Sequence, residues 1–302
     1  MTLLSKSTPS SVKQTEKETP APFIVGMGRS GTTLLRLMLD AHPDLAIPPE
    51  THFIPTAAQA CRESPDPREA FLKALTSFPF WEDHHIDIKL LRQRITAIEP
   101  FDLGDALRAF YRLYAERFKK PRWGDKSAYL PVMRLIQELL PEARFVHIIR
   151  DGRDVALSIK DLWWGPNSVE EAAKWWASGI VSARSQVKDL KWYLEVRYED
   201  LVLDTEPTLR KICAFIALPW SASMLDYHRR AEERLSELTS IMDPNARRIT
   251  TAEERRSIHS FVSKPPEPTR VGRWRTGMTD SDRVCFEQIA GEMLREIGYD
   301  VG

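Results

Sequence analysis

A short apolar run that ends in a glycine-rich turn constrains the fold of this chain more than any other feature. Residues 22–25 are Pro-Phe-Ile-Val, the composition of a buried parallel strand, and residues 26–33 are Gly-Met-Gly-Arg-Ser-Gly-Thr-Thr. Apolar residues then recur at helical spacing from Leu34 to Leu39, before Pro43 ends the helix. In a strand, turn and helix of this kind, backbone N–H groups and the helix dipole favour a bound phosphate.

A second apolar run, at 144–149, has the composition of a central strand, and 192–197 is predicted to be a third strand. Apolar periodicity predicts helices at three further places: 131–140, 154–163 and 169–190. Strands that alternate with helices imply a three-layer α/β fold with a central parallel sheet, whose ligands bind beyond the carboxyl ends of the strands. The mostly helical stretch at about 56–120 is expected to be an insertion in this fold.

The first twenty residues are rich in Ser, Thr and charged residues. They contain too few apolar side chains to offset the entropy lost on ordering them. We therefore expect a disordered polar tail at 1–20 and one domain at 21–302. No run approaches the ~20 apolar residues that span a bilayer, and the first residues lack the pattern of a signal peptide. The sequence thus predicts no transmembrane segment.

The charge balance narrows the choice of partners. The 43 Lys and Arg residues equal the 43 Asp and Glu residues in number, so no net field would hold a nucleic acid, and any anion must bind at a focused site. The three cysteines, Cys61, Cys213 and Cys285, are far apart and form neither a metal-ligand pair nor an even disulfide set. This usage fits a reducing compartment, so we expect a cytoplasmic protein.

The glycine-rich loop departs from the loop of nucleoside triphosphate enzymes at one position. It has both glycines and Thr33 of the pattern G-x-x-x-x-G-K-[ST], but Thr32 stands where a lysine would contact the β and γ phosphates. Arg29 instead places a cation inside the loop. A kinase-like phosphotransferase is therefore an alternative that the sequence opposes, and a nucleotide-binding module without catalysis is a second alternative.

A longer stretch around this loop resembles the opening of the sulfotransferase family, especially its tyrosylprotein branch and bacterial relatives. The match runs from Gly28 to Asp44 and continues to Glu50 and Thr51. In that family the fold is of the P-loop type, and the loop binds the 5′-phosphosulfate of 3′-phosphoadenosine 5′-phosphosulfate (PAPS), the sulfuryl donor, without need of a metal. The resemblance implies donor contacts from five loop residues: Arg29, Ser30, Gly31, Thr32 and Thr33.

A second motif follows the predicted strand at 144–149. Arg150 stands at the carboxyl end of this strand, and Ser158 follows eight residues later, two turns into a helix. The family's second signature is an arginine and a serine at this spacing, both contacting the 3′-phosphate of PAPS. The planar fork of a guanidinium suits phosphate oxygens. The alternative is an ion pair of Arg150 with Asp154 that only caps the helix. A magnesium ligand at Asp151 is disfavoured, since Arg150 beside it opposes a cation.

Three more residues are assigned to the donor by resemblance. Tyr198 follows the predicted strand at 192–197, where the family has a tyrosine near the adenine, although a core tyrosine would look the same. The Pro- and Gly-rich segment that contains Lys264 and Arg273 resembles the loop that closes over the donor. These two cations are therefore expected to contact the 3′-phosphate, with solvated loop charges as the ordinary alternative.

Two cations are expected to stabilise the reaction. In sulfuryl transfer, as in phosphoryl transfer, positioning and charge stabilisation carry most of the catalysis, because negative charge grows on the leaving phosphate as the bond breaks. Arg29 is the first candidate. Lys126 matches the family's second catalytic cation, which touches the transferring group; its alternative is a surface ion pair with Asp125.

An acceptor hydroxyl needs a base within hydrogen-bond reach to take its proton. Glu50 follows Pro48-Pro49 and lies where the tyrosylprotein branch carries its catalytic glutamate in a Glu-Thr pair. The branch that acts on small phenols and steroids uses a histidine instead, so His52 is the reserve base. His84 and His85 are weaker candidates, since no matching motif surrounds them.

The acceptor itself is left open by the sequence: a small molecule, lipid, glycan, peptide or amine. Pro49 stands where the tyrosylprotein branch usually has an acidic residue, which argues against the same peptide recognition. Aromatic residues between 53 and 123, with four tryptophans, could wall an acceptor cleft, although core packing explains most of them. The tryptophans are Trp163, Trp164, Trp175 and Trp176. The oligomeric state cannot be read from the sequence.

Overall fold

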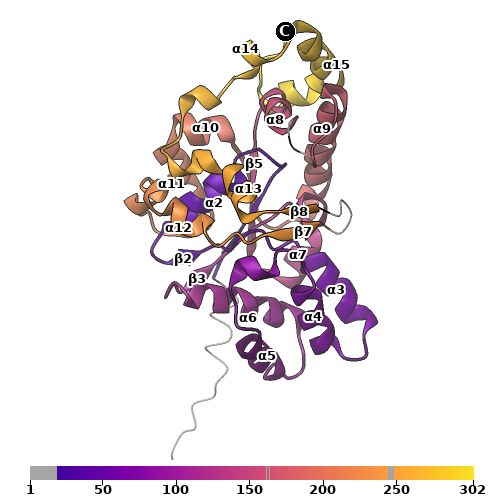
Figure 1. Cartoon of the computed structure of the whole chain (residues 1–302), viewed down its shortest axis with the longest axis vertical. Helices are drawn as coiled ribbons and strands as arrows, with labels where there is room; N and C mark the ends of the chain where they lie inside the picture. Colours follow the sequence, from indigo (N-terminus) through magenta and orange to yellow (C-terminus); the bar gives the residue numbers. More distant parts are fainter. Residues whose placement is uncertain (1–18, 161, 163, 244–247) are drawn as a thin grey trace, which may run out of the picture.

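A four-stranded parallel sheet forms the centre of the computed structural model, which describes residues 19–160, 162, 164–243 and 248–302 (Figure 1). Its strand order is β4-β1-β5-β6. The strands are β4 (Asp125–Lys126), β1 (Ala21–Val25), β5 (Ala143–Ile149) and β6 (Tyr193–Arg197). The three strands predicted at 22–25, 144–149 and 192–197 are thus confirmed, whereas β4 was not predicted. Because all pairs are parallel, the carboxyl ends meet at one edge.

Helices cover both faces of this sheet, since alternate strand residues are buried on opposite sides. Phe23 and Phe145 pack on the face covered by α9 (Val169–Gln186) and α15 (Asp280–Ile297). Ile24 and Val146 pack on the other face, against three helices. These are α2 (Thr32–Asp40), α10 (Tyr198–Leu203) and α11 (Thr205–Phe215). The predicted three-layer α/β fold is confirmed.

The expected helical insertion lies at one end of the molecule in Figure 1. Its helices are α3 (Ile54–Glu63), α4 (Pro67–Thr76), α5 (Ile88–Thr96) and α6 (Leu103–Glu116). An aromatic cluster joins them to the sheet: the rings of Phe53 and Phe110 meet edge to face at 4.9 Å, and Phe23 lies in the same core. Short strands β2 (Leu45–Ala46) and β3 (Arg122–Trp123) pair beside it.

Two helices after the insertion end earlier than their apolar spacing predicts. The helix α8 (Gly152–Ile159) stops four residues short of 163, because the chain turns there and Leu162 N–H donates to the Ile159 carbonyl. The helix α9 ends at Gln186 and gives way to one 3-10 turn at Val187–Asp189. The helix predicted over 131–140 is α7 (Met133–Leu139), preceded by a 3-10 turn. Most of the predicted polar tail, 1–18, lies outside the described residues.

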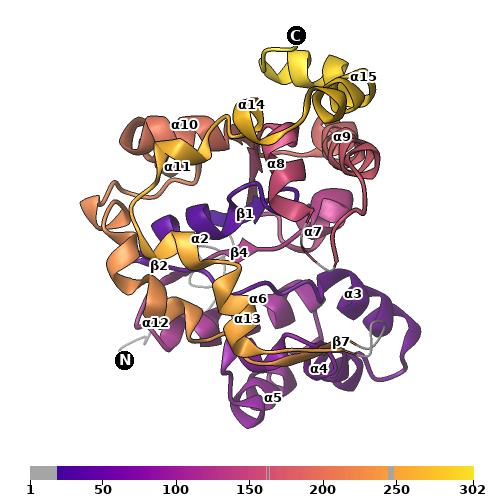
Figure 2. The same ribbon diagram turned by 45° about the horizontal axis from the view of Figure 1, so that its top comes forward.

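Residues 239–243 and 248–270, here called the crossing segment, run across the carboxyl edge of the sheet (Figure 2). The segment follows α12 (Ala231–Leu235) and contains an antiparallel hairpin and a helix. The hairpin strands are β7 (Ile241–Asp243) and β8 (Arg248–Thr250), and the helix is α13 (Ala252–Ser257). A capping box between Thr251 and Glu254 fixes the start of α13. The chain then reaches α14 (Trp274–Gly277) and α15.

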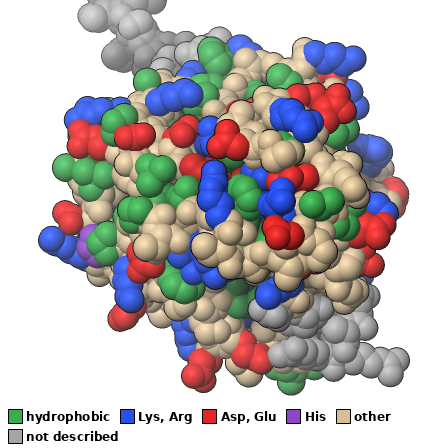
Figure 3. Space-filling view, turned by 90° about the horizontal axis from the view of Figure 1, so that it is seen from above, with side chains coloured by type: hydrophobic (Ala, Val, Ile, Leu, Met, Phe, Trp, Pro, Cys, Tyr) green, Lys and Arg blue, Asp and Glu red, His purple; other side chains and the backbone are tan. Residues whose placement is uncertain are grey.

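The surface mixes charges of both signs. On the face drawn in Figure 3, Lys and Arg side chains alternate with Asp and Glu side chains and form no broad field of one sign. This agrees with the equal numbers of the two kinds in the sequence. Among the helices of the described chain, none has the length and apolar character that a membrane crossing requires.

Candidate active site

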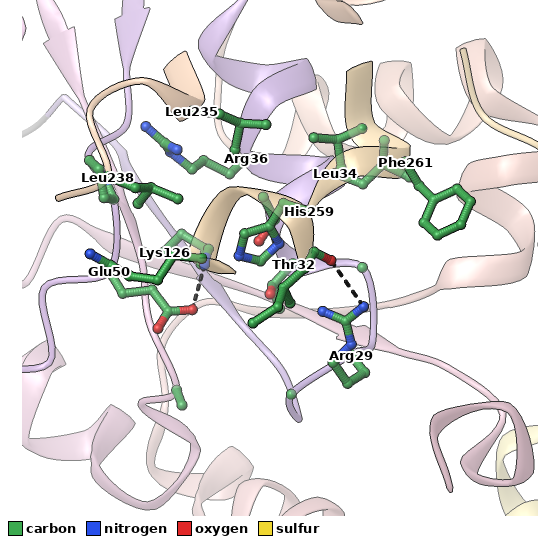
Figure 4. A pocket seen from close by; sticks show the side chains of 18 of the residues that line it. Arg29, Thr32, Leu34, Arg36, Glu50, Lys126, Leu235, Leu238, His259 and Phe261 are labelled. Carbon is green, nitrogen blue, oxygen red and sulfur yellow. Dashed lines mark hydrogen bonds and ion pairs between the residues drawn. The ribbon is translucent and has the colours of Figure 1, made fainter. Parts of the chain in front are cut away.

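A cavity of about 680 Å³ opens at the carboxyl edge of the sheet, beneath the crossing segment (Figure 4). Its floor is the glycine-rich loop that follows β1. Lys126 enters from β4, Arg150 from the end of β5 and Tyr198 from the end of β6. A volume of this size suits a nucleotide-sized ligand. Four separate segments therefore bring Arg29, Lys126, Arg150 and Tyr198 into one space, whereas Ser158 does not line it.

The glycine-rich loop has the geometry of a phosphate cradle. Gly31 precedes α2 with φ +94°, and a Cβ atom there would lie 2.5 Å from the ring of Tyr198. Only glycine fits both the backbone and this contact. Within the described chain no side chain caps the start of α2, so the N–H groups of Thr32 and Thr33 are available to an anion. Gly31, Thr32 and Thr33 line the cavity, while Ser30 is buried beneath it.

Arg29 lies inside the loop in the left-handed region, with φ +69°. Its guanidinium donates to the Ser158 hydroxyl through Nε at 3.2 Å, and to the Ile258 carbonyl at 3.3 Å. Burial lowers the pKa of Arg29, and Arg150 and Arg270 lower it further. Arg29 is thus a partly buried cation surrounded by cations, an arrangement that a bound anion stabilises.

Arg150 is buried, and its guanidinium stacks over the ring of Tyr198 at 4.5 Å from the ring centroid. Its two terminal nitrogens donate to the carbonyls of Arg29 and Arg270, and one lies 3.5 Å from the Asp154 carboxylate. The Nε atom of Arg150 is buried without a hydrogen-bond partner. The predicted ion pair with Asp154 therefore exists, but it leaves one donor of the fork free for a ligand.

The segment before α14 contributes one arginine to the cavity, but it is neither of the two cations that were predicted to contact the donor. Lys264 and Arg273 are exposed and lie outside the cavity, whereas Arg270 lines it. Their predicted contacts with a donor stay predictions. Tyr198 does line the cavity, beside Arg150 and Arg270. The sequence could not fix this register, because the segment folds into short turns without a periodic pattern.

Glu50 and Lys126 form an ion pair at the opposite side of the cavity from Arg29, as the dashed line in Figure 4 shows. Lys126 Nζ donates to Glu50 Oε1 at 2.5 Å, and His52 Nε2 lies 2.9 Å from Oε2. Burial opposes ionisation of Glu50, but Lys126 and His52 outweigh it and hold the pKa of this carboxyl well below its ordinary range. Burial lowers the pKa of Lys126, and Glu50 partly offsets this.

A buried hydrogen-bond network holds this pair in position. The Thr51 hydroxyl donates to Asp125 at 2.7 Å and lies 2.8 Å from the Tyr129 hydroxyl, and the Thr51 N–H donates to Ser127. Asp125 also accepts from the Tyr111 hydroxyl. Since Thr51 follows Glu50 and Asp125 precedes Lys126, the network sets the distance between the two charged side chains. The predicted alternative, an ion pair of Lys126 with its neighbour Asp125, is not what forms.

Of the histidines considered, His52 alone contacts Glu50. His84 is buried and bonded to the Trp81 carbonyl, and burial lowers its pKa to about 4. His85 bonds to the Glu237 carbonyl. Neither lines the cavity. His259, which no motif marked, does line it, close to Lys126 and Thr32 in Figure 4.

The aromatic residues divide between cavity and core. Trp164, Trp175 and Phe80 line the cavity, whereas Trp176 is buried in the core and donates to the Arg150 carbonyl. Trp163 lies outside the described residues. Arg36 and Arg255 also reach the cavity without having been predicted. Arginine on a helix has too many ordinary roles for the sequence to single these two out.

Comparisons with known proteins agree with this geometry. Residues 20–222 match the profile of a family described as the sulfotransferase family. A protein-tyrosine sulfotransferase of Drosophila melanogaster is 29% identical over 294 residues, which cover 94% of this chain and 52% of that protein. Protein-tyrosine sulfotransferase A of Caenorhabditis elegans is 27% identical, over 94% of this chain and 68% of that protein. The chain thus spans about half to two thirds of these relatives.

Solved structures show the same fold. The sulfotransferase domain of the Synechococcus PCC 7002 olefin synthase superposes with a TM-score of 0.61 at 23% identity, covering 94% of this chain and 96% of that one. The sulfotransferase domain from the curacin biosynthetic pathway gives 0.60 at 17% identity, over 94% and 99% of the two chains. The resemblance that the sequence motifs carried is confirmed.

Proposed function

Because the chain belongs to the sulfotransferase family, we propose that it transfers a sulfuryl group from PAPS to a hydroxyl group of an acceptor. One observation carries the proposal. A single cavity holds an uncapped helix start with Arg29 and Arg150 at one side, and the Glu50–Lys126 ion pair at the other. The first group suits the phosphates of a donor, and the second suits a reacting hydroxyl.

The residues present fit PAPS. Arg150 has one buried donor atom without a partner, and the depressed pKa of Arg29 favours an added negative charge nearby. Gly31 keeps the loop backbone open for close approach of a phosphate. The loop and Arg29 would hold the 5′-phosphosulfate, and Arg150 with Ser158 the 3′-phosphate. The face of Tyr198 would lie near the adenine.

The proposed reaction is an in-line displacement at sulfur. The acceptor oxygen attacks the sulfur atom and forms an O–S bond, while its proton passes to the Glu50 carboxylate. The bond between sulfur and the bridging oxygen breaks, and its electron pair stays on the 5′-phosphate of the departing 3′-phosphoadenosine 5′-phosphate (PAP). Lys126 and Arg29 stabilise the negative charge that grows during this step. By analogy with phosphoryl transfer, positioning and charge supply most of the rate.

Glu50 is the proposed base, with His52 as the reserve. Glu50 is ionised at neutral pH because Lys126 and His52 lower its pKa. An ionised carboxylate can accept a proton at once, although its low basicity limits the driving force. His52 is bound to the same carboxylate and packs against the rings of Phe80 and Tyr129. Its position supports a role in orienting Glu50.

A magnesium-dependent kinase finds less support. Both carboxylate oxygens of Asp151, the acidic residue at the end of β5, already accept hydrogen bonds from Arg153. The loop carries Thr32 in place of the lysine that contacts the β and γ phosphates of a triphosphate. A binding module without catalysis would not require the Glu50–Lys126 pair.

Calorimetric titration tests the donor without knowledge of the acceptor. The purified protein is titrated with PAP, with ATP plus magnesium, and with 5′-AMP. We expect PAP to bind at least tenfold more tightly than the other two, because Arg150 and Ser158 are the proposed partners of the 3′-phosphate that they lack. Preference for magnesium ATP would instead favour the kinase, and equal affinity for PAP and 5′-AMP would remove the role of Arg150.

A further inference from the structure

The half of the cavity that holds Glu50 differs in chemistry from the half that holds Arg29. Figure 4 shows Leu235 and Leu238 on the side of Glu50 and Lys126, away from Arg29. Apart from the ion pair, His52, Arg36 and Arg255, the lining that comes from the segments around Glu50, Phe80 and Leu238 is apolar and includes Pro49, Pro79, Phe80, Leu238, Ile241 and Met242. Phe80 lies next to the base, since its ring centroid is 6.0 Å from that of His52. A molecule presented to Glu50 therefore contacts carbon surface.

Apolar surface also continues out of the cavity. Met242 is 53% exposed although it lines the cavity, and Ile249 lies opposite it across the hairpin and is 57% exposed. Side chains directly opposite in an antiparallel pair share one face. Exposed apolar side chains that gather at the mouth of a cavity mark a binding surface for an apolar ligand.

The positively charged side chains in this half of the cavity already form ion pairs and hydrogen bonds within the protein. Arg255 binds the buried Asp83 carboxylate at 2.5 Å and the Thr239 carbonyl at 2.7 Å. Arg36 donates to the Ile47 carbonyl and to Glu237. Lys126 binds Glu50. Among the described residues that line the half with Glu50, each cation already has a partner inside the protein and none is available to bind acidic groups of an acceptor. The Glu50 carboxylate also repels such groups.

From this lining we infer that the acceptor is an uncharged alcohol or phenol with an apolar body, and not an acidic tyrosine peptide. The inference rests on the proposed function and specifies its second substrate. In the same displacement, the hydroxyl oxygen bonds to sulfur and gives its proton to Glu50, while the apolar body covers Phe80, Ile241 and Met242. The two relatives described above are protein-tyrosine sulfotransferases, so this chain would differ from them in the partner that it modifies.

The first test compares two acceptors on the full chain. With saturating PAPS, the rate of PAP release is measured for 2-naphthol and for the peptide Asp-Glu-Tyr-Glu-Asp. We expect kcat/KM for 2-naphthol to be at least tenfold higher. A higher kcat/KM for the peptide overturns the inference, as does the failure of 2-naphthol to react while PAP binds.

A matched pair of variants locates the contact. Met242→Ser removes an apolar side chain from the cavity lining, and Val181→Ser removes one that is 54% exposed on α9 and lies outside it. We expect Met242→Ser to raise KM for 2-naphthol at least fivefold, and Val181→Ser to leave it within twofold. Both should bind PAP as the parent chain does. An unchanged KM in Met242→Ser, or an equal rise in both variants, overturns the inference.

PAP binding distinguishes a failure of the acceptor inference from a failure of the proposed function. If PAP binds tightly and the peptide is the better acceptor, the proposed function stands and the acceptor inference fails. If PAP does not bind, the proposed function fails, and the acceptor inference fails with it.

Discussion

The Nε atom of Arg29 lies 3.2 Å from the hydroxyl of Ser158. The family resemblance assigns these two residues to opposite ends of one donor, Arg29 to the 5′-phosphosulfate and Ser158 to the 3′-phosphate. While the Nε–H group of Arg29 donates to Ser158, it cannot donate to the 5′-phosphosulfate. We therefore expect donor binding to exchange this contact for contacts with the two phosphate groups.

Ser158→Ala tests this exchange. The variant loses one donor to the 3′-phosphate, so KM for PAPS should rise about tenfold to 100-fold, the size of one hydrogen bond to a charged group. The turnover number should stay within twofold, because Arg29 keeps its charge and its place in the loop. Steady-state kinetics with varied PAPS separates the two constants. A fall in turnover without a change in KM would assign Ser158 to the positioning of Arg29.

Glu50→Gln should lower turnover by about 100-fold or more while PAP affinity changes less than threefold. The amide keeps the size of the side chain but cannot accept the acceptor's proton, and general bases contribute about 10² to 10⁴ in rate. The matched variant is His52→Gln, which removes the partner of Glu50 and should cost about tenfold. If His52→Gln is the more damaging of the two, the histidine is the base.

Arg150→Ala should weaken PAP binding by about tenfold to 100-fold and leave 5′-AMP binding nearly unchanged. The guanidinium is buried at the cavity wall, and a charge-assisted hydrogen bond with phosphate is worth about 1.5 to 3 kcal/mol. Arg273→Ala is the control, because Arg273 is exposed and lies outside the cavity. Calorimetry with both nucleotides gives the two affinities. Loss of PAP affinity in the Arg273 variant alone would mean that the cavity rearranges around the donor.

His259 should make donor binding depend on pH. Burial, with Lys126 and Arg29 nearby, lowers the pKa of this imidazole to about 3. It is therefore neutral well above pH 3, and the negative charge of PAP will raise its pKa, so that binding takes up a proton and affinity falls as pH rises from about 3 through the raised pKa of the complex. Calorimetry at pH 5 in two buffers of different ionisation enthalpy measures the uptake. His259→Gln should reduce the uptake; equal values in both proteins would exclude the histidine.

Asp125 should couple the stability of the fold to pH. Burial raises the pKa of this carboxyl to about 6, against the hydrogen bonds from Thr51 and Tyr111. The folded protein therefore keeps a proton that the unfolded chain releases above about pH 4. The stabilisation from this group is complete below pH 4 and is lost as pH rises through 6, by at most about 3 kcal/mol.

Urea unfolding of the parent chain and of Asp125→Asn measures this term. The free energy of unfolding of the parent minus that of the variant should fall from pH 4.5 to pH 7.5. Other titrating groups cancel in this subtraction, so the fall reports on Asp125 alone. A difference that is constant with pH would show that the carboxyl is ionised throughout.

The sequence predicted the parts of the fold that have a strong local signal. Strands β1 and β5 are mostly apolar on both faces, and β6 has apolar residues at alternate positions, which distinguishes the three strands from surface segments. Strand β4 has only two residues, one of them Lys126, so neither periodicity nor composition marks it. The strands of the β7–β8 hairpin have only three residues each, and Ile241 and Met242 line the cavity and do not belong to a core.

The site could be predicted in part, for a related reason. Arg29 and Gly31 sit in a continuous motif, whereas Glu50 and Lys126 are 76 residues apart, and only the family resemblance indicated that they act together. His259 and Arg270 lie in turns whose side-chain directions depend on how the segment crosses the sheet edge. Such positions follow from tertiary structure, which no local pattern encodes.

The ion pair between Asp83 and Arg255 ties the hairpin side of the crossing segment to the helical insertion, and it lies apart from the glycine-rich loop. The walls that would choose the acceptor are thus fastened to one another by a side-chain contact, whereas the nucleotide cradle meets the crossing segment at a backbone carbonyl, that of Ile258. Evolution can then exchange the acceptor while the machinery that handles the sulfuryl donor is inherited unchanged. A chimaera that receives the insertion and hairpin of a relative together, with this ion pair intact, should acquire that relative's acceptor preference.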